Sequence, residues 1–231
     1  MRIKKLNKKV LRFSGQVDDL IQGYTSQTTN AHHNAFLDIQ GKIVVTHDQI
    51  RSGADALLIV IEKQYEERLR THLGKYLPLF DISIEAPALE VYFDLDGDHA
   101  FADGDHVIPQ SQGCLIITPN SLQTNVGEDE FNLFRLNHHL PIQGLDYDDT
   151  LLLNIAQDER IDYDKGCYLG QEIIARVHYR AKPPLQLKAL DLKTLSPKAS
   201  AIATSITHNP ETNQAKGFVF LRDQASKGRV L

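Results

Sequence analysis

The feature that most constrains the fold is a series of strand patterns interrupted by one helix pattern between residues 34 and 86. The stretch NAFLDIQGKIVVTHDQIR has β-rich segments on both sides of Gln40-Gly41, and glycine suits a tight turn between antiparallel strands. ALLIVIE then predicts a buried strand, KQYEERLRTHLGKYL an amphipathic helix and DISIEA a further strand. Hairpin strands beside a single helix favour an α+β sandwich over a doubly wound sheet.

The flanking segments extend this prediction. The spacing of Val17, Leu20 and Ile21 predicts one short helix near the start of the chain. After residue 88, LEVYFDL and GCLIIT predict a second sheet around a loop rich in glycine and aspartate. Beyond Pro183-Pro184, the runs LKALDL, ASAIATSI and KGFVFL predict a small β module without a helix.

The composition indicates a globular protein. A chain of 231 residues with 42% hydrophobic residues can bury a substantial core without disulfides or metals. No run approaches the ~20 apolar residues of a membrane span, and the start MRIKKLNKKVLRF lacks the apolar core of a secretory signal. We therefore expect a cytoplasmic protein with no membrane partner, in which the two cysteines are free thiols.

The charge distribution bears on nucleic-acid binding. The formal net charge of −5 argues against a dedicated nucleic-acid binder, which normally presents a basic face to phosphates. The first twelve residues run against this trend, because they contain a basic cluster and no acid. Such a cluster either contacts RNA or an acidic partner, or is simply a solvated terminus. Its members are Arg2, Lys4, Lys5, Lys8, Lys9 and Arg12.

Two patterns resemble metal sites without fitting one. The loop DLDGDHAFADGD, residues 94–105, has alternating aspartates, but His99 and Asp105 occupy the positions where a calcium-binding helix-loop-helix requires glycine and glutamate. Asp-Gly turns explain this loop better. The doublets His32-His33 and His138-His139 would point to opposite faces of a strand and have no supporting cysteine or glutamate. No stably bound metal is expected.

The two cysteines lie in different surroundings. Cys114, in QGCLIIT, is expected to be a buried and unreactive thiol. Cys167 lies in DYDKGCYLGQEIIARVHYRAK, just before a predicted helix. The positive end of that helix and the charge of Lys165 would favour a thiolate, and Gly166 and Gly170 would let backbone or a ligand approach the sulfur. A reactive thiol and a cysteine without function both stay open on these features.

Three charged residues follow at helical spacing. Glu172, Arg176 and Arg180 share one face of the predicted helix. We predict that they line a polar pocket beside Cys167. The alternative is a solvated helix face with weak ion pairs.

Residues 165–172, KGCYLGQE, resemble the K-G-C-Y-x-G-Q-E signature of the YgfZ family, folate-binding proteins related to the aminomethyltransferase (T protein) of the glycine cleavage system. The resemblance runs from about residue 13 to residue 182. FLDIQGKIVV is similar to the family's first hairpin, ARVHYR to the continuation of the signature, and Asn154 and Ile161 to the segment before it. The predicted site residues are Lys165, Gly166, Cys167, Tyr168, Gly170, Gln171, Glu172, Arg176 and Arg180.

The resemblance implies a ring of three domains around a central hole that holds tetrahydrofolate or a derivative. It also implies a role in making or repairing iron–sulfur enzymes, including a tRNA methylthiolation enzyme, with those enzymes or assembly proteins as partners. The sequence departs from the family pattern at three places. These departures predict an incomplete third domain of the ring and a lower affinity for folate. Ala181 replaces a usual glycine, Leu152-Leu153 replaces a usual Pro-Glu or Pro-Gln before Asn154, and the C-terminal module is shorter than usual.

The predicted architecture is therefore α+β, with mixed or antiparallel sheet domains in a ring-like arrangement and a small C-terminal β module. Residues 1–29 plus 87–182 would form a discontinuous folate-binding domain that carries the signature. Residues 30–86 would form an inserted ferredoxin-like domain, and residues 183–231 the short C-terminal module.

Three functions are compatible with these features. The first is a folate-binding accessory factor in iron–sulfur cluster assembly or repair, linked to tRNA modification, in which Cys167 acts together with a partner. Clusters take about four cysteine ligands and the chain has two cysteines, so it would not hold a cluster alone. The second is a folate-dependent one-carbon (aminomethyl) transferase, although the related T protein lacks the cysteine signature. The third is an RNA-binding module that contacts tRNA through the basic N-terminus.

Overall fold

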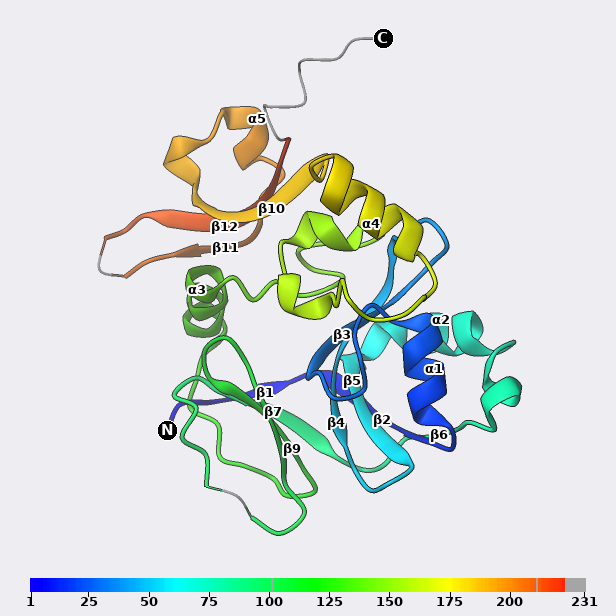
Figure 1. Ribbon diagram of the computed structural model, residues 1–231. Helices are drawn as coiled ribbons and strands as arrows, with labels where there is room; N and C mark the ends of the chain where they lie inside the picture. The colour runs from blue at the N-terminus through cyan, green and yellow to red at the C-terminus, as the bar shows by residue number, and fades with distance from the viewer. Residues whose placement is uncertain (101, 211, 223–231) are drawn as a thin grey trace.

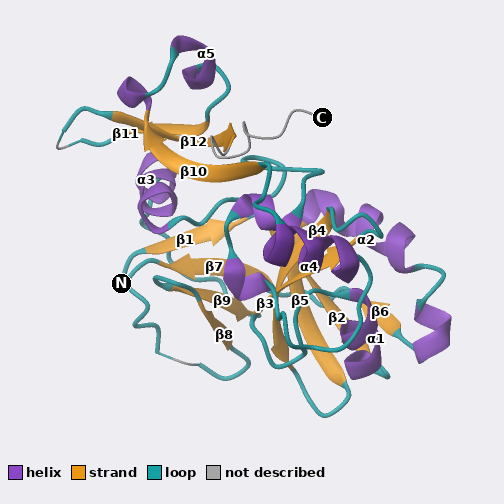
Figure 2. Cartoon of the chain, turned by 45° about the horizontal axis from the view of Figure 1, so that its top comes forward, coloured by secondary structure: helices purple, strands orange, loops and turns teal. Residues whose placement is uncertain are grey.

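The computed structural model describes residues 1–100, 102–210 and 212–222 (Figure 1). These residues contain three antiparallel sheets and five α-helices. The α+β class predicted from the sequence is confirmed. The arrangement of the sheets is best followed in Figure 2, where the C-terminal sheet lies apart from the two larger ones. No helix of the described residues has the length and apolar character needed to cross a membrane.

The five-stranded sheet carries the hairpin that the sequence predicts, and its strand order is β3-β4-β5-β2-β6. Helices α1 (Val17–Tyr24) and α2 (Glu66–Leu73) pack their apolar faces into one core with this sheet. Both helices were predicted from their apolar spacing. The strands are β2 (Lys8–Ser14), β3 (His33–Leu37), β4 (Ile43–Arg51), β5 (Ala56–Glu62) and β6 (Ser83–Glu85).

The four-stranded sheet, of order β1-β7-β9-β8, packs against the other face of the five-stranded sheet. Val10 and Val60 of the larger sheet share a core with Phe93 and Leu115 of the smaller one. Because both of its faces are covered, β5 is a continuous apolar run instead of an alternating one. The strands are β1 (Ile3–Leu6), β7 (Glu90–Asp94), β8 (His106–Pro109) and β9 (Cys114–Thr118).

The N-terminal segment contributes to both larger sheets. Strand β1 pairs with β7 of the four-stranded sheet. Strand β2 pairs with β5 and β6, and α1 packs on the same five-stranded sheet. The chain therefore passes from one sheet to the other at Asn7, while the division into domains predicted from the sequence stays a prediction. Strand β2 lies inside the five-stranded sheet and has both faces buried. Val10 packs into the core shared with the four-stranded sheet, whereas Leu11 and Phe13 pack into the core shared with α1 and α2.

Helix α3 (Glu128–His138) lies between the four-stranded sheet and the C-terminal sheet in both views. The rings of Phe131 and Phe134 lie 5.5 and 5.7 Å from that of Phe93. One turn after Phe131, Arg135 forms a buried ion pair with Asp146, with 2.7 Å between Nη1 and Oδ2. This pair is central to how the C-terminal sheet attaches.

The C-terminal sheet has the order β10-β12-β11, with β10 (Leu185–Asp191), β11 (Thr204–His208) and β12 (Ala215–Arg222). The hydroxyls of Thr204 and Ser205 donate to Asp146, and Phe218 packs into the core of the body. The stretch ASAIATSI was predicted as a strand, but it begins in the short helix α5 (Pro197–Ser200), because Ser196 caps the backbone N–H of Ala199. Residues 211 and 223–231 of the predicted module lie outside the described residues.

Candidate functional site

The signature loop, residues 165–170, leads into helix α4 (Gln171–Arg180), which was predicted from its apolar spacing. The loop presents Cys167 to solvent, whereas Cys114 is buried on β9. Burial raises the pKa of the Cys114 thiol to about 11, so this sulfur stays protonated. The structure thus separates an accessible thiol from an inert one.

Lys165 anchors the signature loop. Its buried Nζ donates to the backbone oxygens of Ile21, Thr25 and Gln27, at 3.2, 2.8 and 2.9 Å. Ile21 lies in the last turn of α1 and Thr25 caps it, where carbonyls lack helical partners and a cation is favoured. Burial lowers the pKa of this lysine to about 8. The ammonium therefore binds the carbonyl groups at the C-terminal end of α1.

Two glycines join the signature loop to the predicted hairpin. Gly170 has φ +86°, and a Cβ on it would lie 2.5 Å from the backbone oxygen of Asp38. A Cβ on Gly41, which has φ +72° in the hairpin turn, would lie 3.3 Å from the Cβ of Ile173. The two stretches that resemble the same family thus meet backbone against backbone. Only a glycine at position 170 allows this close backbone contact.

The other signature residues divide between core and solvent. Tyr168 is buried, with its ring centroid 5.1 Å from Lys165 Nζ, and Gly166 is exposed. Gln171 is half-buried, and its Nε2 donates to the backbone oxygen of Lys165 at 3.4 Å. Ile174 packs into the hydrophobic core and marks the buried face of α4. The prediction of a polar pocket on the opposite face is wrong, because three residues there are exposed: Glu172, Arg176 and Arg180.

A second candidate site, which no sequence pattern predicted, lies at the junction of the two larger sheets, α3 and the segment 140–160. A cavity of about 60 Å³, the inner cavity, lies there. It shares Gln110, Leu140 and Arg160 with a larger depression of about 470 Å³, the outer hollow. The polar side chains that line the inner cavity are Lys8, Asp48, Gln110, Arg135, Gln157 and Arg160.

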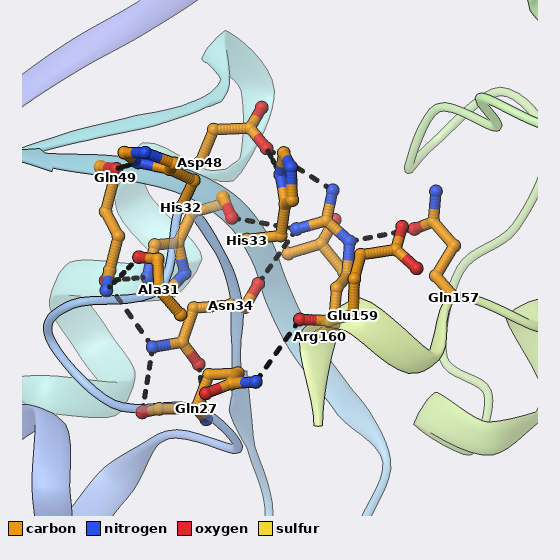
Figure 3. Close-up of polar contacts among 12 residues, drawn as sticks. Gln27, Ala31, His32, His33, Asn34, Asp48, Gln49, Gln157, Glu159 and Arg160 are labelled. Carbon is orange, nitrogen blue, oxygen red and sulfur yellow. Dashed lines mark hydrogen bonds and ion pairs between the residues drawn. The ribbon is translucent and has the colours of Figure 1, made fainter. Parts of the chain in front are cut away.

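Arg160 organises one wall of the inner cavity (Figure 3). Its Nη1 donates to the backbone oxygens of Asn34 and His47 at 3.1 and 2.8 Å, and its Nε donates to Gln157 Oε1 at 2.8 Å. Its Nη2 lies 3.5 Å from Asp48 Oδ1. The guanidinium therefore connects the segment before the signature to β3 and β4.

Asp48 and His47 occupy adjacent positions on β4 and differ in charge. Burial by itself would raise the pKa of Asp48, but the hydrogen bond with His33 and the charge of Arg160 hold it well below its usual range. Burial lowers the pKa of His47 to about 4, and its Nε2 pairs with Gln49 Oε1 at 3.0 Å. The site thus keeps an ionised carboxylate beside a neutral imidazole.

Two of the residues that line the inner cavity each have a buried donor without a partner among the described residues. These donors are Nε of Arg135 and Nε2 of Gln110. The remaining guanidinium nitrogens of Arg135 are engaged by Leu140, Asp146, Asn132 and Ser205. The lining also includes Phe93 and Phe131, so the inner cavity has both polar and aromatic residues in its walls.

The basic N-terminus is largely neutralised. Five of its six cationic residues form ion pairs with carboxylates, which lie on both larger sheets and on α2, α3 and the β7–β8 loop. This weakens the basis for RNA binding through this segment. The pairs are Arg2–Asp96, Lys4–Glu128, Lys5–Glu90, Lys8–Glu62 and Lys9–Glu66.

The aspartate loop after β7 brings three carboxylates together without the arrangement of a calcium loop. Asp94, Asp96 and Asp98 each offer an oxygen within 4.8 Å of the others. The Asp94 carboxylate accepts hydrogen bonds from the backbone N–H groups of Asp96 and Asp98, and Asp96 forms an ion pair with Arg2. These contacts agree with the turn interpretation.

No family model matches the chain. The chain is 28% identical over 159 residues to the "iron-sulfur cluster assembly factor IBA57 homolog, mitochondrial" of Dictyostelium discoideum. The aligned stretch covers 55% of this chain and 39% of that relative. The chain is IBA57/YgfZ-like. The resemblance drawn from the signature is thereby confirmed, although the IBA57/YgfZ-like chain spans only about two fifths of the relative's length.

The fold of the IBA57/YgfZ-like chain is also similar to a solved structure. Glycine cleavage system aminomethyltransferase T from Bartonella henselae matches with a TM-score of 0.70, over 95% of this chain and 78% of that one. The two sequences are 12% identical, so this likeness shows the fold alone. Three antiparallel sheets in the aminomethyltransferase arrangement are therefore established for the chain.

Proposed function

We propose that the chain is a folate-binding accessory factor in iron–sulfur cluster assembly or repair, with Cys167 as its functional thiol. The observation that carries the proposal is the presentation of Cys167. It is exposed at a loop that Lys165 fastens to α1 and Gly170 fastens to the β3–β4 turn. The similarity to an iron-sulfur cluster assembly factor supports the same role.

Cys167 would act with groups from outside the chain. The thiolate is the form of cysteine that binds iron, and clusters take about four such ligands. Cys114 is buried with a raised pKa, so among the two cysteines only Cys167 is available to a cluster that passes as cargo. Iron–sulfur assembly proteins or client enzymes would supply the remaining ligands. A client that modifies tRNA would account for a link to tRNA without direct RNA contact.

The inner cavity and outer hollow suit a folate-type ligand. The lining of the inner cavity combines Arg135, Gln110 and the ionised Asp48 with Phe93 and Phe131, and a polar heteroaromatic ring requires polar and aromatic residues of these kinds. The outer hollow, at about 470 Å³, falls within the roughly 300–1,000 Å³ of small-molecule sites. When bound, such a ligand supplies one-carbon chemistry. The chain's own residues would bind and orient it.

The test compares two cysteine variants in cells that lack the native chain. Cys167→Ser should lower the specific activity of iron–sulfur client enzymes to the level of cells without the protein, at unchanged protein abundance. Cys114→Ala should leave that activity intact, and an enzyme without a cluster serves as the internal control. Full client activity with normally abundant Cys167→Ser would refute the proposal.

A further inference from the structure

The exposed side of α4 carries two arginines without partners among the described residues. Arg176 and Arg180 lie one turn apart, are both exposed, and form no ion pair or hydrogen bond with any of those residues. In contrast, five of the six cations of the basic N-terminus are ion-paired. The chain has more acidic than basic residues, so a shortage of carboxylates does not explain the two unpaired arginines.

An aromatic cluster borders these arginines. The ring of His178 stacks on that of Tyr163, with 3.8 Å between centroids, and meets the ring of Tyr179 edge-on at 4.7 Å. Tyr179 is 68% exposed. Tyrosine and arginine are enriched at the energetic centres of protein interfaces. Four exposed residues of α4 thus have the composition of a binding face, and we refer to them as the α4 surface: Arg176, His178, Tyr179 and Arg180.

Carboxylates close to the α4 surface restrict what it can bind. Glu172 is exposed one turn before Arg176. Burial and the nearby charge of Asp158 raise the pKa of Tyr163 to about 12, which shows that this carboxylate lies near the aromatic cluster. Both acids and the net charge of −5 would repel the uniformly charged backbone of a nucleic acid. A folded protein can instead place its carboxylates opposite the two arginines alone.

The α4 surface belongs to the same structural unit as the exposed thiol. Gly170 is the N-cap of α4, and Cys167 lies in the loop immediately before it. The ten residues of α4 extend about 15 Å. An ordinary interface buries roughly 800 Å² on each partner, which is wide enough to cover the helix and the loop together. One docked protein can therefore contact the α4 surface and reach Cys167.

We propose that the α4 surface docks an acidic protein, whose carboxylates pair with Arg176 and Arg180 while its surface covers Tyr179. This inference rests on the proposed iron–sulfur role and adds the chemistry of the partner. Charge attraction of this kind speeds the encounter and fixes the orientation of the two proteins. The partner's cluster ligands are thereby brought to the loop that presents Cys167.

Photo-crosslinking in the cell tests the docking. Replacing Glu172 by p-benzoylphenylalanine puts a photoreactive group beside the α4 surface and leaves both arginines in place. In cells that lack the native chain, we expect a nuclease-resistant adduct with a protein, attached within an acidic segment that mass spectrometry identifies. Combining Arg176→Glu with Arg180→Glu should reduce the adduct about tenfold, because two attractions become repulsions. Without the crosslinker, the same pair should lower the activity of iron–sulfur client enzymes at unchanged protein abundance.

The matched control reverses two exposed cations elsewhere. Lys63→Glu with Lys198→Glu changes the net charge equally, and neither lysine forms an ion pair with a described residue. This control should keep both the adduct and the client activity. Urea unfolding and the alkylation rate of Cys167 should match the native chain in both double variants. The milder Arg176→Gln with Arg180→Gln avoids acidic residues at the end of α4 and should still reduce the adduct about threefold.

Three outcomes would overturn the docking surface. An adduct that nuclease removes would assign the surface to RNA, and an adduct of two copies of this chain would assign it to self-association. Equal adduct in the α4 variants and the control would mean that the arginines are merely solvated. Cys167→Ser separates docking from function, because it should keep the adduct while client activity falls. Full client activity with Cys167→Ser would end the iron–sulfur role, and the charge-dependent adduct would then still establish the docking surface.

Discussion

The signature loop and the inner cavity differ in how the chain builds them and in the residues that form them. The loop is a continuous stretch that holds one exposed thiol by close backbone contacts at Gly170 and by the buried ammonium of Lys165. The cavity is assembled from both larger sheets, α3 and the segment 140–160, and none of its lining residues belongs to the signature. A short motif therefore identifies the presentation of the thiol, and the topology alone creates the candidate ligand site.

The two regions also handle buried charge differently. The ammonium of Lys165 is solvated by backbone carbonyls, so the loop contains one buried cation and no buried acid. Around the cavity, Arg160 faces Asp48 and Arg135 faces Asp146. Removing one member of such a pair leaves an uncompensated charge. The cavity should consequently be the region that is more sensitive to substitution.

Arg160→Met should produce the largest loss of stability. It leaves Asp48 without its buried cation and removes the donor to the backbone oxygens of Asn34 and His47. We expect the free energy of unfolding in urea to fall by about 3–5 kcal/mol. Arg176→Met, on the exposed face of α4, is the control and should cause no measurable change. Equal effects of the two substitutions would remove the distinction between the regions.

Gly170→Ala tests the loop's dependence on close backbone contact. The new Cβ would lie 2.5 Å from Asp38 O in a backbone with φ +86°, so both strain and overlap should lower the free energy of unfolding by about 3 kcal/mol. Gly53 also has a positive φ, of +113°, but has no atom within 4 Å of an added Cβ. Gly53→Ala isolates the strain and should cost less. A cost for Gly170→Ala no greater than that control would show that the contact is dispensable.

The pH dependence of stability should report on His47. Its folded pKa of about 4 lies below the ordinary 6.5, so the unfolded chain binds the proton more readily. Stability is therefore complete above pH 6.5 and should fall by roughly 3 kcal/mol as the pH drops towards 4. The contribution of Asp48 is lost only below its ordinary 3.8.

Urea unfolding between pH 4.5 and 7.5 measures this slope. His47→Gln keeps a donor for Gln49 and should flatten the curve, whereas replacing the exposed His178 by Gln should not. An unchanged slope in His47→Gln would show that other groups carry the pH dependence.

Local patterns predicted most elements, since apolar spacing determines which residues can face a core. The hairpin about Gly41, the strands β5, β7 and β9 and the helices α1, α2 and α4 follow from such spacing. Strand β2 was missed because Lys8 and Lys9 resemble a solvated terminus, while Val10, Leu11 and Phe13 behind them fill two cores. At Asn7 the chain leaves the four-stranded sheet and enters the five-stranded one. Tertiary packing determines this change, and no local sequence pattern indicates it.

Site prediction succeeded only where chemistry was local. The accessibility of Cys167 and the burial of Cys114 followed from their neighbours. The direction of the Lys165 ammonium did not, because it depends on where α1 ends in space. Equal spacing placed Arg176 and Arg180 on one face of α4, but it could not show that this face meets solvent. The inner cavity was missed since Asp48, Gln110 and Arg160 are distant in sequence.

Alkylation rates compare the two thiols directly. Iodoacetamide should modify Cys167 of the native protein at least tenfold faster than Cys114, which is buried and has a raised pKa. Mass spectrometry of timed samples gives both rates, and a sample unfolded in urea provides the reference in which both thiols are accessible. Similar rates in the native protein would contradict the contrast between an exposed and a shielded sulfur.

The most direct test of the account is the affinity of Cys167→Ser for tetrahydrofolate, measured by calorimetry beside the native chain. No residue of the signature loop lines the inner cavity or the outer hollow, so thiol chemistry and ligand binding should be separable. We expect a Kd within about twofold of the native value, a difference below roughly 0.5 kcal/mol. Loss of binding in a folded Cys167→Ser protein would instead place the thiol within the ligand site and contradict the separation of the two regions.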